Sequence, residues 1–477
     1  MTTLSRLVSV SASRALIGFS LLILLLCSMN ATAATLFGVV SERSAPELAA
    51  GADRFLQAHP EHTLILRTPE QLEKLSDSEL AALWQDADAV LLTAVFGDTA
   101  ARLSRLLSEH PPAGDTLIAV HSDQNLIQRS THRGRALLSA IDQDTLRDFS
   151  RSPATEEETE RQLAEQLAAY PEQAFWLTAR AYWGGRGSEN LANLIAWLLQ
   201  DAAPELEPIA PAPQTPVRFL HQGTPVALDA LPADARFVAL LDHHTGDRSG
   251  DRELHEQLCQ ALANHDLNCL SVLARWGEPS VAALAALQTL ADSGQLAAVL
   301  SLQDFVVGGG DGREAATANL ARLDVPVLKG IRLADRTETQ WRLSEDGMPW
   351  DTTYYQVAMP ELQGISQPML LAAVTAARRH AATGLDLRLS RPIAAQIDAT
   401  AARLARWAAL QDKDNSDKRV AIVYYNHRPG GTTSAPTTSM SRPLCGNYCT
   451  PYRPPVTKPA NCRIRRPLCL ISFSNKA

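Results

Sequence analysis

Cysteine is scarce in the long central part of this sequence. Between residues 34 and 431 there are only two, Cys259 and Cys269. So few cysteines exclude a disulfide framework, and the fold must therefore depend on a hydrophobic core. A content of 45% hydrophobic and 20% charged residues is ordinary for such a core. The two cysteines flank one predicted helix, where a disulfide is possible; we favour two buried free thiols.

Acidic residues are missing from the last part of the chain. Residues 432–477 hold seven Lys or Arg and no Asp or Glu. Because the whole chain has a formal net charge of −8, residues 1–431 carry −15. Binding to nucleic acid needs clustered Lys and Arg, so a body this acidic argues against nucleic acid as a partner.

Two motifs of nucleotide-binding proteins are also missing. No G-x-G-x-x-G sequence follows the first predicted strand, so a dinucleotide-binding domain is not supported. The run Gly308–Gly312 follows residues 303–307 but lacks the Lys-Ser/Thr pair of a phosphate-binding P-loop. We therefore predict a flexible connection there and no ATP site in this chain.

The first 33 residues have the pattern of a secretory signal peptide. Arg6 and Arg14 form a basic region, Ala15–Leu26 an apolar region, and Ala31-Thr32-Ala33 a small-residue cleavage site. We predict cleavage after Ala33 and a periplasmic or exported protein. The alternative is an uncleaved anchor in the inner membrane, but the apolar run is shorter than the roughly 20 residues that span a bilayer.

From Thr35 onward, short apolar runs alternate with amphipathic segments, a pattern typical of βαβ units on a parallel sheet. Such sheets bind ligands beyond the carboxyl ends of their strands, here near Ser41 and residues 93–97. The predicted elements of this first lobe, residues 34–141, are strand Thr35–Val40, helix Ala45–Gln57, strand Thr63–Leu66, helix Ser76–Trp84, strand Ala89–Thr93, helix Asp98–Ser108 and strand Thr116–His121.

The rest of the chain divides by composition. Residues 142–202 have a helical pattern, residues 203–216 form a Pro-rich linker, and residues 217–380 repeat the alternation of the first lobe. Residues 381–418 are predicted to be a helical connector. In the second lobe we predict strand Phe237–Leu241, helix Arg252–Asn264, strand Leu267–Leu273, helix Val281–Gly294, strand Ala297–Leu302, helix Ala315–Leu323 and strand Val325–Ile331.

The predicted fold class is therefore α/β, with two Rossmann-like (flavodoxin-like) parallel-sheet lobes joined by a helical connection. At 477 residues the chain is long enough for this organisation. Residues 419–431 contain a five-residue apolar run, Val420–Tyr424, followed by Pro429, Gly430 and a further glycine. They are expected to be the start of a C-terminal domain that is otherwise missing.

A glycine-rich stretch in the helical section could contact a flat ligand. It runs from Tyr182 through Trp183, Gly184 and Gly185 to Asn190. The glycines would let a loop approach the ligand, Trp183 would stack on it, and Ser188 would cap the next helix. The alternative, which we favour, is a structural connection between two helices with a buried tryptophan.

Two histidines follow the first strand of the second lobe, in the sequence Asp242-His243-His244. Imidazoles at a strand end could bind a metal ion, or the metal of a macrocycle. Two adjacent His side chains rarely point at one ion, however, and no further ligands at suitable spacing are evident. An exposed polar loop is the preferred interpretation, and no metal site is predicted.

Six segments of the chain together carry a family resemblance. They are Gly184-Gly185 with Glu189-Asn190-Leu191, the lobe starting at Phe237, Leu323–Leu328, Val357–Gly364, Leu404–Leu410 with Trp407, and Val420–Gly431. Taken in order, they resemble the large subunit of cobaltochelatase, CobN, and its relative in magnesium chelatase, the large H subunit of that enzyme. The segment around Glu361 resembles a V-x-x-P-E-L-D-G pattern of that family, from which this chain departs by having Gln363 in place of the acid.

The resemblance implies a subunit that holds a tetrapyrrole, a corrin or a porphyrin, while Co²⁺ or Mg²⁺ is inserted, as in cobalamin biosynthesis. In that family separate AAA+ subunits supply ATP hydrolysis, which agrees with the missing P-loop. Insertion removes two pyrrole protons and strips water from the ion, so a carboxylate or imidazole base is expected beside a flat cleft. Glu361, His243 and His244 have this chemistry, with Glu361 also suited to capping a turn after Pro360.

Export conflicts with an ATP-dependent partner, because AAA+ subunits and ATP are cytosolic. Some CobN-like proteins accompany haem-uptake systems, so this chain also resembles an exported protein that binds a tetrapyrrole or removes its metal. This is the alternative function that the sequence leaves open.

The resemblance is lost after His427. The family continues as N-H-P-P-G-R-H-N-I-G-A-D-N-L, whereas here His427 is followed by R-P-G-G-T-T. Plausible GC-rich codons read one nucleotide earlier would restore the family sequence, so we predict a frameshift between His427 and Arg428. Residues 432–477 are then expected to be disordered and the chain to be an incomplete fragment, inactive alone. The four cysteines of this tail lack the paired spacing of a zinc site.

Overall fold

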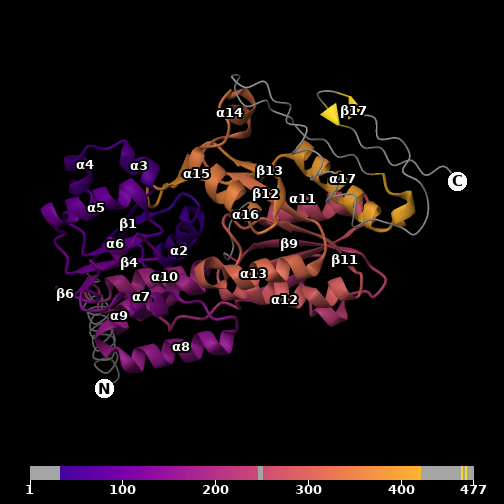
Figure 1. Cartoon of the computed structure of the whole chain (residues 1–477). Helices are drawn as coiled ribbons and strands as arrows, with labels where there is room; N and C mark the ends of the chain where they lie inside the picture. The colour runs from indigo at the N-terminus through magenta and orange to yellow at the C-terminus, as the bar shows by residue number, and fades with distance from the viewer. Residues whose placement is uncertain (1–32, 245–250, 420–463, 466–467, 470–477) are drawn as a thin grey trace, which may run out of the picture. The chain divides into compact units, whose positions relative to one another are not determined.

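The structure is a computed structural model that describes residues 33–244, 251–419, 464–465 and 468–469. The chain divides into two compact units, Met1–Ala405 and Arg406–Ala477. Both large sheets lie in the first unit (Figure 1). The second unit contains the end of α17 (Ala394–Gln411), a 3₁₀ turn at Asn415–Asp417, and the short antiparallel pair β17 (Ile464–Arg465) and β18 (Leu468–Cys469).

The first sheet has the strand order β2-β1-β3-β4-β5-β6. Its first four strands are parallel, and their order is that of flavodoxin-like folds, as predicted. The last two are short antiparallel additions that the sequence analysis missed. The strands are β1 (Thr35–Val40), β2 (Thr63–Arg67), β3 (Ala89–Thr93), β4 (Thr116–Val120), β5 (Thr131–His132) and β6 (Arg135–Ala136).

Helices cover both faces of this sheet, because successive residues of each strand point to opposite sides. Leu36 and Val40 of β1 belong to one buried cluster, and Phe37 and Val39 to another. The first lobe also contains two short helices that were not predicted, α3 and α6. Its helices are α2 (Ala45–Ala58), α3 (Pro69–Glu73), α4 (Asp77–Ala82), α5 (Gly97–Glu109) and α6 (Gln124–Ile127).

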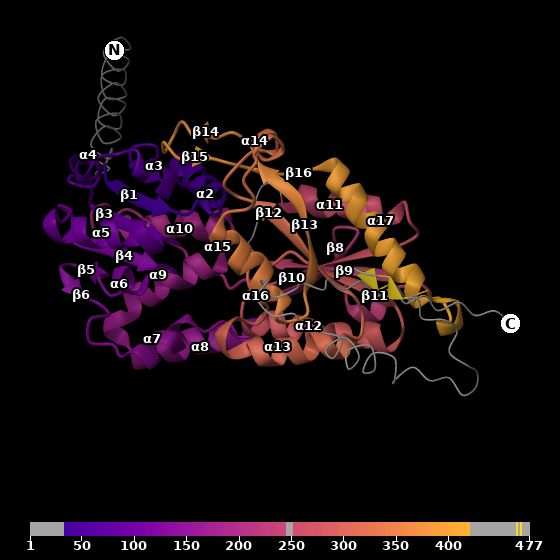
Figure 2. The same ribbon diagram turned by 45° about the horizontal axis from the view of Figure 1, so that its top comes forward.

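The helical section belongs to the first lobe and is not a free connection. Leu191 and Leu194 of α10 are fully buried in the same cluster as α2 and β1, and α10 lies beside α2 (Figure 2). The Pro-rich linker then runs along α10, where Asn190 exchanges two hydrogen bonds with the backbone of Ala212. The section consists of α7 (Gln143–Ser150), α8 (Glu156–Ala169), a 3₁₀ turn (Pro171–Gln173), α9 (Ala174–Gly185) and α10 (Gly187–Leu199).

The second sheet has the order β16-β13-β12-β11-β9-β10-β7-β8. Its five central strands are parallel and again follow the flavodoxin-like order. On one side β16 pairs antiparallel with β13 as the edge strand, and on the other β7 pairs antiparallel with β10 and is followed by the edge strand β8. The strands are β7 (Val217–His221), β8 (Thr224–Pro225), β9 (Phe237–His243), β10 (Asn268–Ala274), β11 (Leu296–Ser301), β12 (Val327–Leu333), β13 (Ser366–Val374) and β16 (Ser390–Pro392).

Helices α12 and α13 pack side by side against this sheet (Figures 1 and 2). The segment between β12 and β13 holds three short helices and one π-helical turn, Tyr354–Ala358. The helices of the second lobe are α11 (Asp251–Ala263), α12 (Glu278–Asp292), α13 (Gly309–Leu323), α14 (Glu338–Leu343), α15 (Trp350–Thr353) and α16 (Met359–Glu361), with a 3₁₀ turn at Leu228–Ala230.

Three sequence-based expectations differ from the structure. Cys259 and Cys269 form a disulfide with a Cα–Cα distance of 5.1 Å, so the preferred prediction of free thiols is wrong. The run Gly308–Gly312 is the N-terminal turn of α13 and not a flexible connection, with Gly308 in the left-handed conformation just before the helix. Residues 381–393, expected to be helical, contain β15 (Asp386–Leu387), which pairs with β14 (Arg378–Arg379), and also β16.

Other predictions fall on residues outside the described ranges. These are the signal peptide up to Thr32, the strand Val420–Tyr424, and most of the tail after residue 431. Within the part of the chain that the structure describes, no helix is both long and apolar enough to cross a membrane.

Candidate functional site

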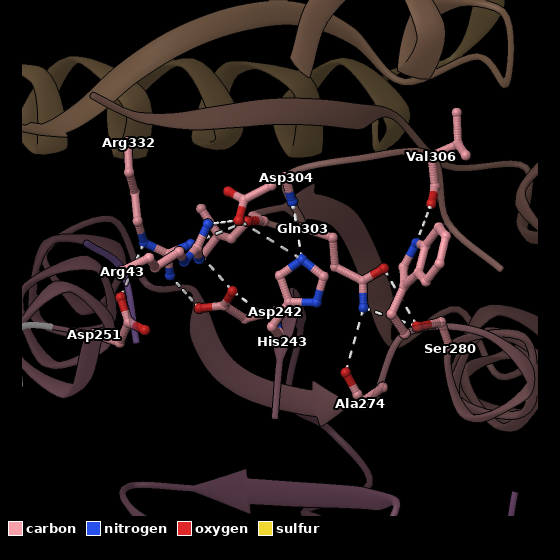
Figure 3. Close-up of polar contacts among 12 residues, drawn as sticks. Arg43, Asp242, His243, Asp251, Ala274, Ser280, Gln303, Asp304, Val306 and Arg332 are labelled. Carbon is pink, nitrogen blue, oxygen red and sulfur yellow. Dashed lines mark hydrogen bonds and ion pairs between the residues drawn. The ribbon is translucent and has the colours of Figure 1, made fainter. Parts of the chain in front are cut away.

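Charged side chains gather at the carboxyl ends of the central strands of the second sheet (Figure 3). Asp242 and His243 end β9, Gln303 and Asp304 follow β11, and Arg332 is near the end of β12. The prediction placed Asp242 and His243 in a loop after the strand. They instead extend the strand, because their backbones pair with Leu273 and Ala274 of β10.

Asp242 is the centre of this cluster and is only 1% exposed. Its carboxylate accepts hydrogen bonds from both terminal nitrogens of Arg332 and lies 2.9 Å from Nε2 of His255. Burial alone would raise the pKa of Asp242, but the charge of Arg332 and the hydrogen bond from His255 outweigh it and hold the pKa well below its usual range. Asp242 is therefore ionised throughout the physiological pH range.

The hydrogen bonds continue from His255 to Ser271 on β10, with 2.8 Å between Nδ1 and Oγ. The Asp242 carboxylate can only accept, so Nε2 of His255 carries a proton and donates to it, while Nδ1 lies within hydrogen-bond distance of the serine hydroxyl. Ser271 is 7% exposed and lies inside the sheet. This Ser–His–Asp series is therefore a buried polar network, since its hydroxyl is buried within the sheet.

Arg43 brings the first lobe into the same cluster (Figure 3). It follows β1 and forms an ion pair with Asp304 of the second lobe. Burial, together with repulsion from Arg332, lowers the pKa of Arg43 to about 10. One terminal nitrogen of Arg43, Nη2, is buried without a hydrogen-bond partner. The carboxyl edges of both sheets therefore meet here, close to the position that the predicted strand end at Ser41 indicated.

Lys329 of β12 lies beside these charges and is 1% exposed. Its ammonium group donates a hydrogen bond to the carbonyl oxygen of Gln303. Burial, and then repulsion from Arg332, lowers the pKa of Lys329 to about 7. Near neutral pH this side chain is thus divided between its charged and neutral forms, and it can accept or release a proton.

The predicted histidines point to different places. His243 Nε2 accepts a hydrogen bond of 3.1 Å from the backbone N–H of Asp304, whereas Nδ1 of His244 lies 2.8 Å from the carbonyl oxygen of Thr215. Because a carbonyl only accepts, Nδ1 of His244 carries the proton. Burial lowers the pKa of His244 to about 4, so its ring is neutral at physiological pH. The two rings therefore do not converge on one ion.

Glu361 is exposed and ends the short helix α16, directly after the π-helical turn Tyr354–Ala358. Gln363, which stands where the V-x-x-P-E-L-D-G pattern has an acidic residue, is buried. Its amide accepts from the N–H of Val307 at 2.8 Å and donates to the carbonyl of the same residue at 3.0 Å. A carboxylate could not donate the second bond, so glutamine suits this position and fixes the loop before α13.

A row of exposed aromatic side chains, which the sequence analysis missed, lies at the same edge of the second sheet. We call it the aromatic ladder: Trp276, Phe305, Tyr355, Tyr354 and Trp350, which are 45%, 44%, 49%, 39% and 79% exposed. Successive ring centroids are 6.2, 5.7, 5.0 and 5.8 Å apart. Its members follow β10 and β11 or belong to the segment before α16, so no local sequence pattern connects them.

The predicted stacking residue Trp183 lies within α9 and is 3% exposed. The guanidinium of Arg186 lies 4.3 Å from the centre of its ring. The helix α9 continues to Gly185 and α10 begins at Gly187, so Ser188 is inside α10 and does not cap it. The glycine-rich stretch is therefore a tight helix–helix junction with a buried tryptophan.

His59, Glu61 and His62 form a second cluster of possible metal ligands, before β2. However, Nδ1 of His62 accepts a hydrogen bond of 3.0 Å from the N–H of Ala34. The neutral ring then carries its proton on Nε2, the atom that faces Glu61 at 3.3 Å. Nε2 makes no hydrogen bond in the described structure, and it cannot bind a metal ion while it keeps the ring proton.

Two flavodoxin-like lobes with buried charges at their strand ends and exposed aromatic rings beside them define the class. This is a two-lobed α/β protein, and in proteins of this class ligands generally bind beyond the carboxyl ends of the strands, where these side chains lie. A family model described as CobN/Magnesium Chelatase matches residues 180–440, more than half of the chain. The chain belongs to this family, as the resemblance predicted.

Similar curated proteins include the magnesium-chelatase H subunit from Rhodobacter capsulatus, 23% identical over 56% of this chain and 24% of the relative. The aerobic cobaltochelatase CobN protein of Pseudomonas aeruginosa is 28% identical over 40% of this chain and 15% of the relative. The chain therefore spans no more than about a quarter of either relative. The catalytic subunit of cobaltochelatase from Mycobacterium tuberculosis aligns over 81% of this chain and 28% of its own, with 17% identity and a TM-score of 0.43.

Proposed function

We propose that this chain supplies a tetrapyrrole-binding part of a CobN-like metal chelatase, which holds a corrin while cobalt is inserted. The aromatic ladder is the observation that carries the proposal. Five exposed aromatic rings lie in one row, and flat macrocycles stack on such rings. The ladder also includes the π-helical turn at Tyr354 and Tyr355, a feature frequent at functional sites.

Metal insertion requires a base for the two pyrrole protons. Glu361 is the candidate, because it is exposed and follows the π-helical turn of the ladder within the same segment. The buried Asp242 network would support the strand ends without touching the macrocycle. Separate AAA+ subunits would supply ATP hydrolysis, in agreement with α13 beginning at a glycine run that lacks a P-loop sequence.

The secretory pattern of residues 1–33 favours a second candidate function. In that case the protein is exported to the periplasm, where it binds haem or another tetrapyrrole for uptake or removes the metal. The two candidates share the macrocycle and differ in the compartment and the direction of metal transfer.

Titration of the purified full chain with hydrogenobyrinate diamide, protoporphyrin and haem, followed by the Soret band, tests both candidates. Binding should shift the band, and Trp350→Ala with Tyr355→Ala should weaken binding about tenfold or more, since each stacked aromatic contributes about 0.5–1.5 kcal/mol beyond its area. Ile209→Ala is the control, because Ile209 is an exposed apolar residue, 67% exposed, that lies in the Pro-rich linker and is not part of the ladder.

The outcomes separate the candidates. A preference for the metal-free corrin supports the chelatase, whereas a preference for haem, with metal-free porphyrin released over time, supports the exported protein. No spectral change with any macrocycle would overturn both. Unchanged binding in the double variant would overturn the role of the aromatic ladder.

A further inference from the structure

The junction between α9 and α10 contains an unusual backbone conformation. Arg186 has φ 56° and ψ −172°, a region that is essentially restricted to glycine. Its side chain stacks on Trp183 and lies 3.4 Å from the carboxylate of Glu47. The same carboxylate accepts a hydrogen bond of 3.0 Å from the backbone N–H of Gly187. The fold therefore holds an arginine where glycine would be less strained.

Two more arginines lie near Arg186. Arg180 lies in α9, six residues before Arg186, and Arg275 directly follows β10. The guanidinium of Arg275 passes close to α9, since its Nη2 would be 3.5 Å from a Cβ at Gly184. Burial lowers the pKa of Arg180 to about 10, and repulsion from Arg275 adds to this effect. Burial and then repulsion from Arg186 lower the pKa of Arg275. Arg275 is therefore repelled by both of the other guanidinium groups.

The partners of these arginines are mostly uncharged. Arg180 donates to the carbonyl oxygen of Arg151 at 3.2 Å, and Arg275 to the hydroxyl of Ser152 at 3.3 Å. Among the described residues, neither arginine forms an ion pair with a carboxylate. Glu47, which pairs with Arg186, is thus the one carboxylate paired with any of the three cations in the part of the chain that the structure describes.

A buried donor without a partner lies in the same cluster. Trp183 is 3% exposed, and its Nε1 has no hydrogen-bond partner within the described structure. Buried N–H groups are rarely left unpaired, because the lost hydrogen bond to water is costly. The cluster is therefore rich in donors and positive charge and poor in acceptors, which is the composition of an anion-binding site.

We propose that Arg180, Arg186 and Arg275 bind a carboxylate group, and that this group is an acidic side chain of the tetrapyrrole. The second half of the inference rests on the proposed function. It is supported by position, since Arg275 immediately precedes Trp276 of the aromatic ladder. A macrocycle stacked on the ladder would carry its acidic periphery toward Arg275. Corrins and porphyrins of biosynthetic pathways bear such carboxylates at their edge.

Two synthetic porphyrins of similar size test this proposal on the full chain. One is tetrakis(4-carboxyphenyl)porphyrin, an anion, and the other tetrakis(N-methyl-4-pyridyl)porphyrin, a cation. Arg180→Gln and Arg275→Gln keep hydrogen-bonding side chains but remove the charge. Each should weaken binding of the anionic porphyrin about tenfold or more and leave the cationic one unchanged. Arg133→Gln is the control, because its exposed side chain pairs with Asp201 elsewhere.

A small free carboxylate tests the anion site independently of macrocycle binding. Citrate should raise the midpoint of thermal unfolding of the parent chain and have less effect on Arg275→Gln. If citrate acts in this way but neither porphyrin binds, the anion site stands and the proposed function fails. If the anionic porphyrin binds equally to the parent and both arginine variants, and citrate has the same effect on all, the anion site is overturned while tetrapyrrole binding stands.

Discussion

The carboxylate of Asp242 accepts hydrogen bonds from both terminal nitrogens of Arg332, across the strand β11 that separates their own strands. Both side chains are almost fully buried. Removing one partner of such a pair leaves a charge in a poorly solvating environment, which costs more than the pair itself contributes.

Replacing Asp242 with Asn tests this relationship. We expect the variant to lose about 3–5 kcal/mol of unfolding free energy, because Arg332 would keep its charge without a counter-charge at that position. Urea unfolding followed by circular dichroism measures the loss. Asp201→Asn is the control, and it should cost less than about 1 kcal/mol because Asp201 is 30% exposed and pairs with surface side chains. Equal effects of the two substitutions would contradict the prediction.

The depressed pKa of Asp242 also predicts how stability depends on acid. A carboxylate with a folded-state pKa below its unfolded value contributes stability that is fully present above the unfolded value, about 3.9. This contribution is lost as the pH falls below about 4 toward the folded-state pKa. The parent chain should therefore lose more stability than Asp242→Asn when the pH is lowered through this range. Urea unfolding at several pH values measures this. Equal losses of unfolding free energy in the two proteins would contradict the prediction.

His244 should make stability pH-dependent in a different range. Its pKa is about 4 in the folded chain and about 6.5 when unfolded, so the unfolded chain binds more protons between these values. Stability should fall by about 2 kcal/mol from this group between about pH 7.5 and about pH 5. His244→Asn keeps an N–H donor for Thr215 and should lack this loss. Exposed His265→Asn serves as the control and should behave as the parent chain.

Gly185 is required by a close approach of the linker to the helix junction. A Cβ at this position would lie 2.3 Å from the carbonyl oxygen of Ala212 and 2.5 Å from Nδ2 of Asn190. Gly185→Ala should therefore cost about 1–3 kcal/mol, as overpacking does. Gly310→Ala, in α13 with open space around it, should instead stabilise by up to about 1 kcal/mol. Thermal unfolding checks this: the midpoint should fall for Gly185→Ala and rise for Gly310→Ala.

The disulfide between Cys259 and Cys269 should stabilise the second lobe modestly, because it closes a loop of only about ten residues. The entropy of closing such a loop predicts about 2–3 kcal/mol. Dithiothreitol should lower the urea midpoint of the parent chain and leave a Cys259→Ser, Cys269→Ser double variant unchanged. If dithiothreitol lowered the urea midpoint of both proteins equally, the effect would come from other cysteines and the prediction would be wrong.

The core strands were predictable because they are buried on both faces. Thr35–Val40 and Ala89–Thr93 have the bounds that the apolar runs indicated, since parallel strands in the middle of an α/β sheet are continuous apolar segments. The strand β13 was missed because Pro368 lies within it, and proline normally argues against a strand interior. The short edge strands were missed because two or three residues carry no periodicity.

The candidate site was less predictable, because its parts are distant in sequence. Glu361, His243, His244 and Trp183 were singled out from local motifs, yet these four do not form one constellation in the structure. His243 and His244 bond to different segments, and Trp183 is buried in a helix. Their predicted roles in catalysis and tetrapyrrole binding remain predictions.

By itself, the sequence determined the alternation of strands and helices, the two-lobed α/β class and the family. These follow from hydrophobic periodicity and local motifs, which are properties of neighbouring residues. Only the tertiary structure decided which charges are buried together, as in Arg43 with Asp304, and which aromatic rings share a surface. Those contacts depend on strand order and on the approach of distant loops, and no local pattern encodes them.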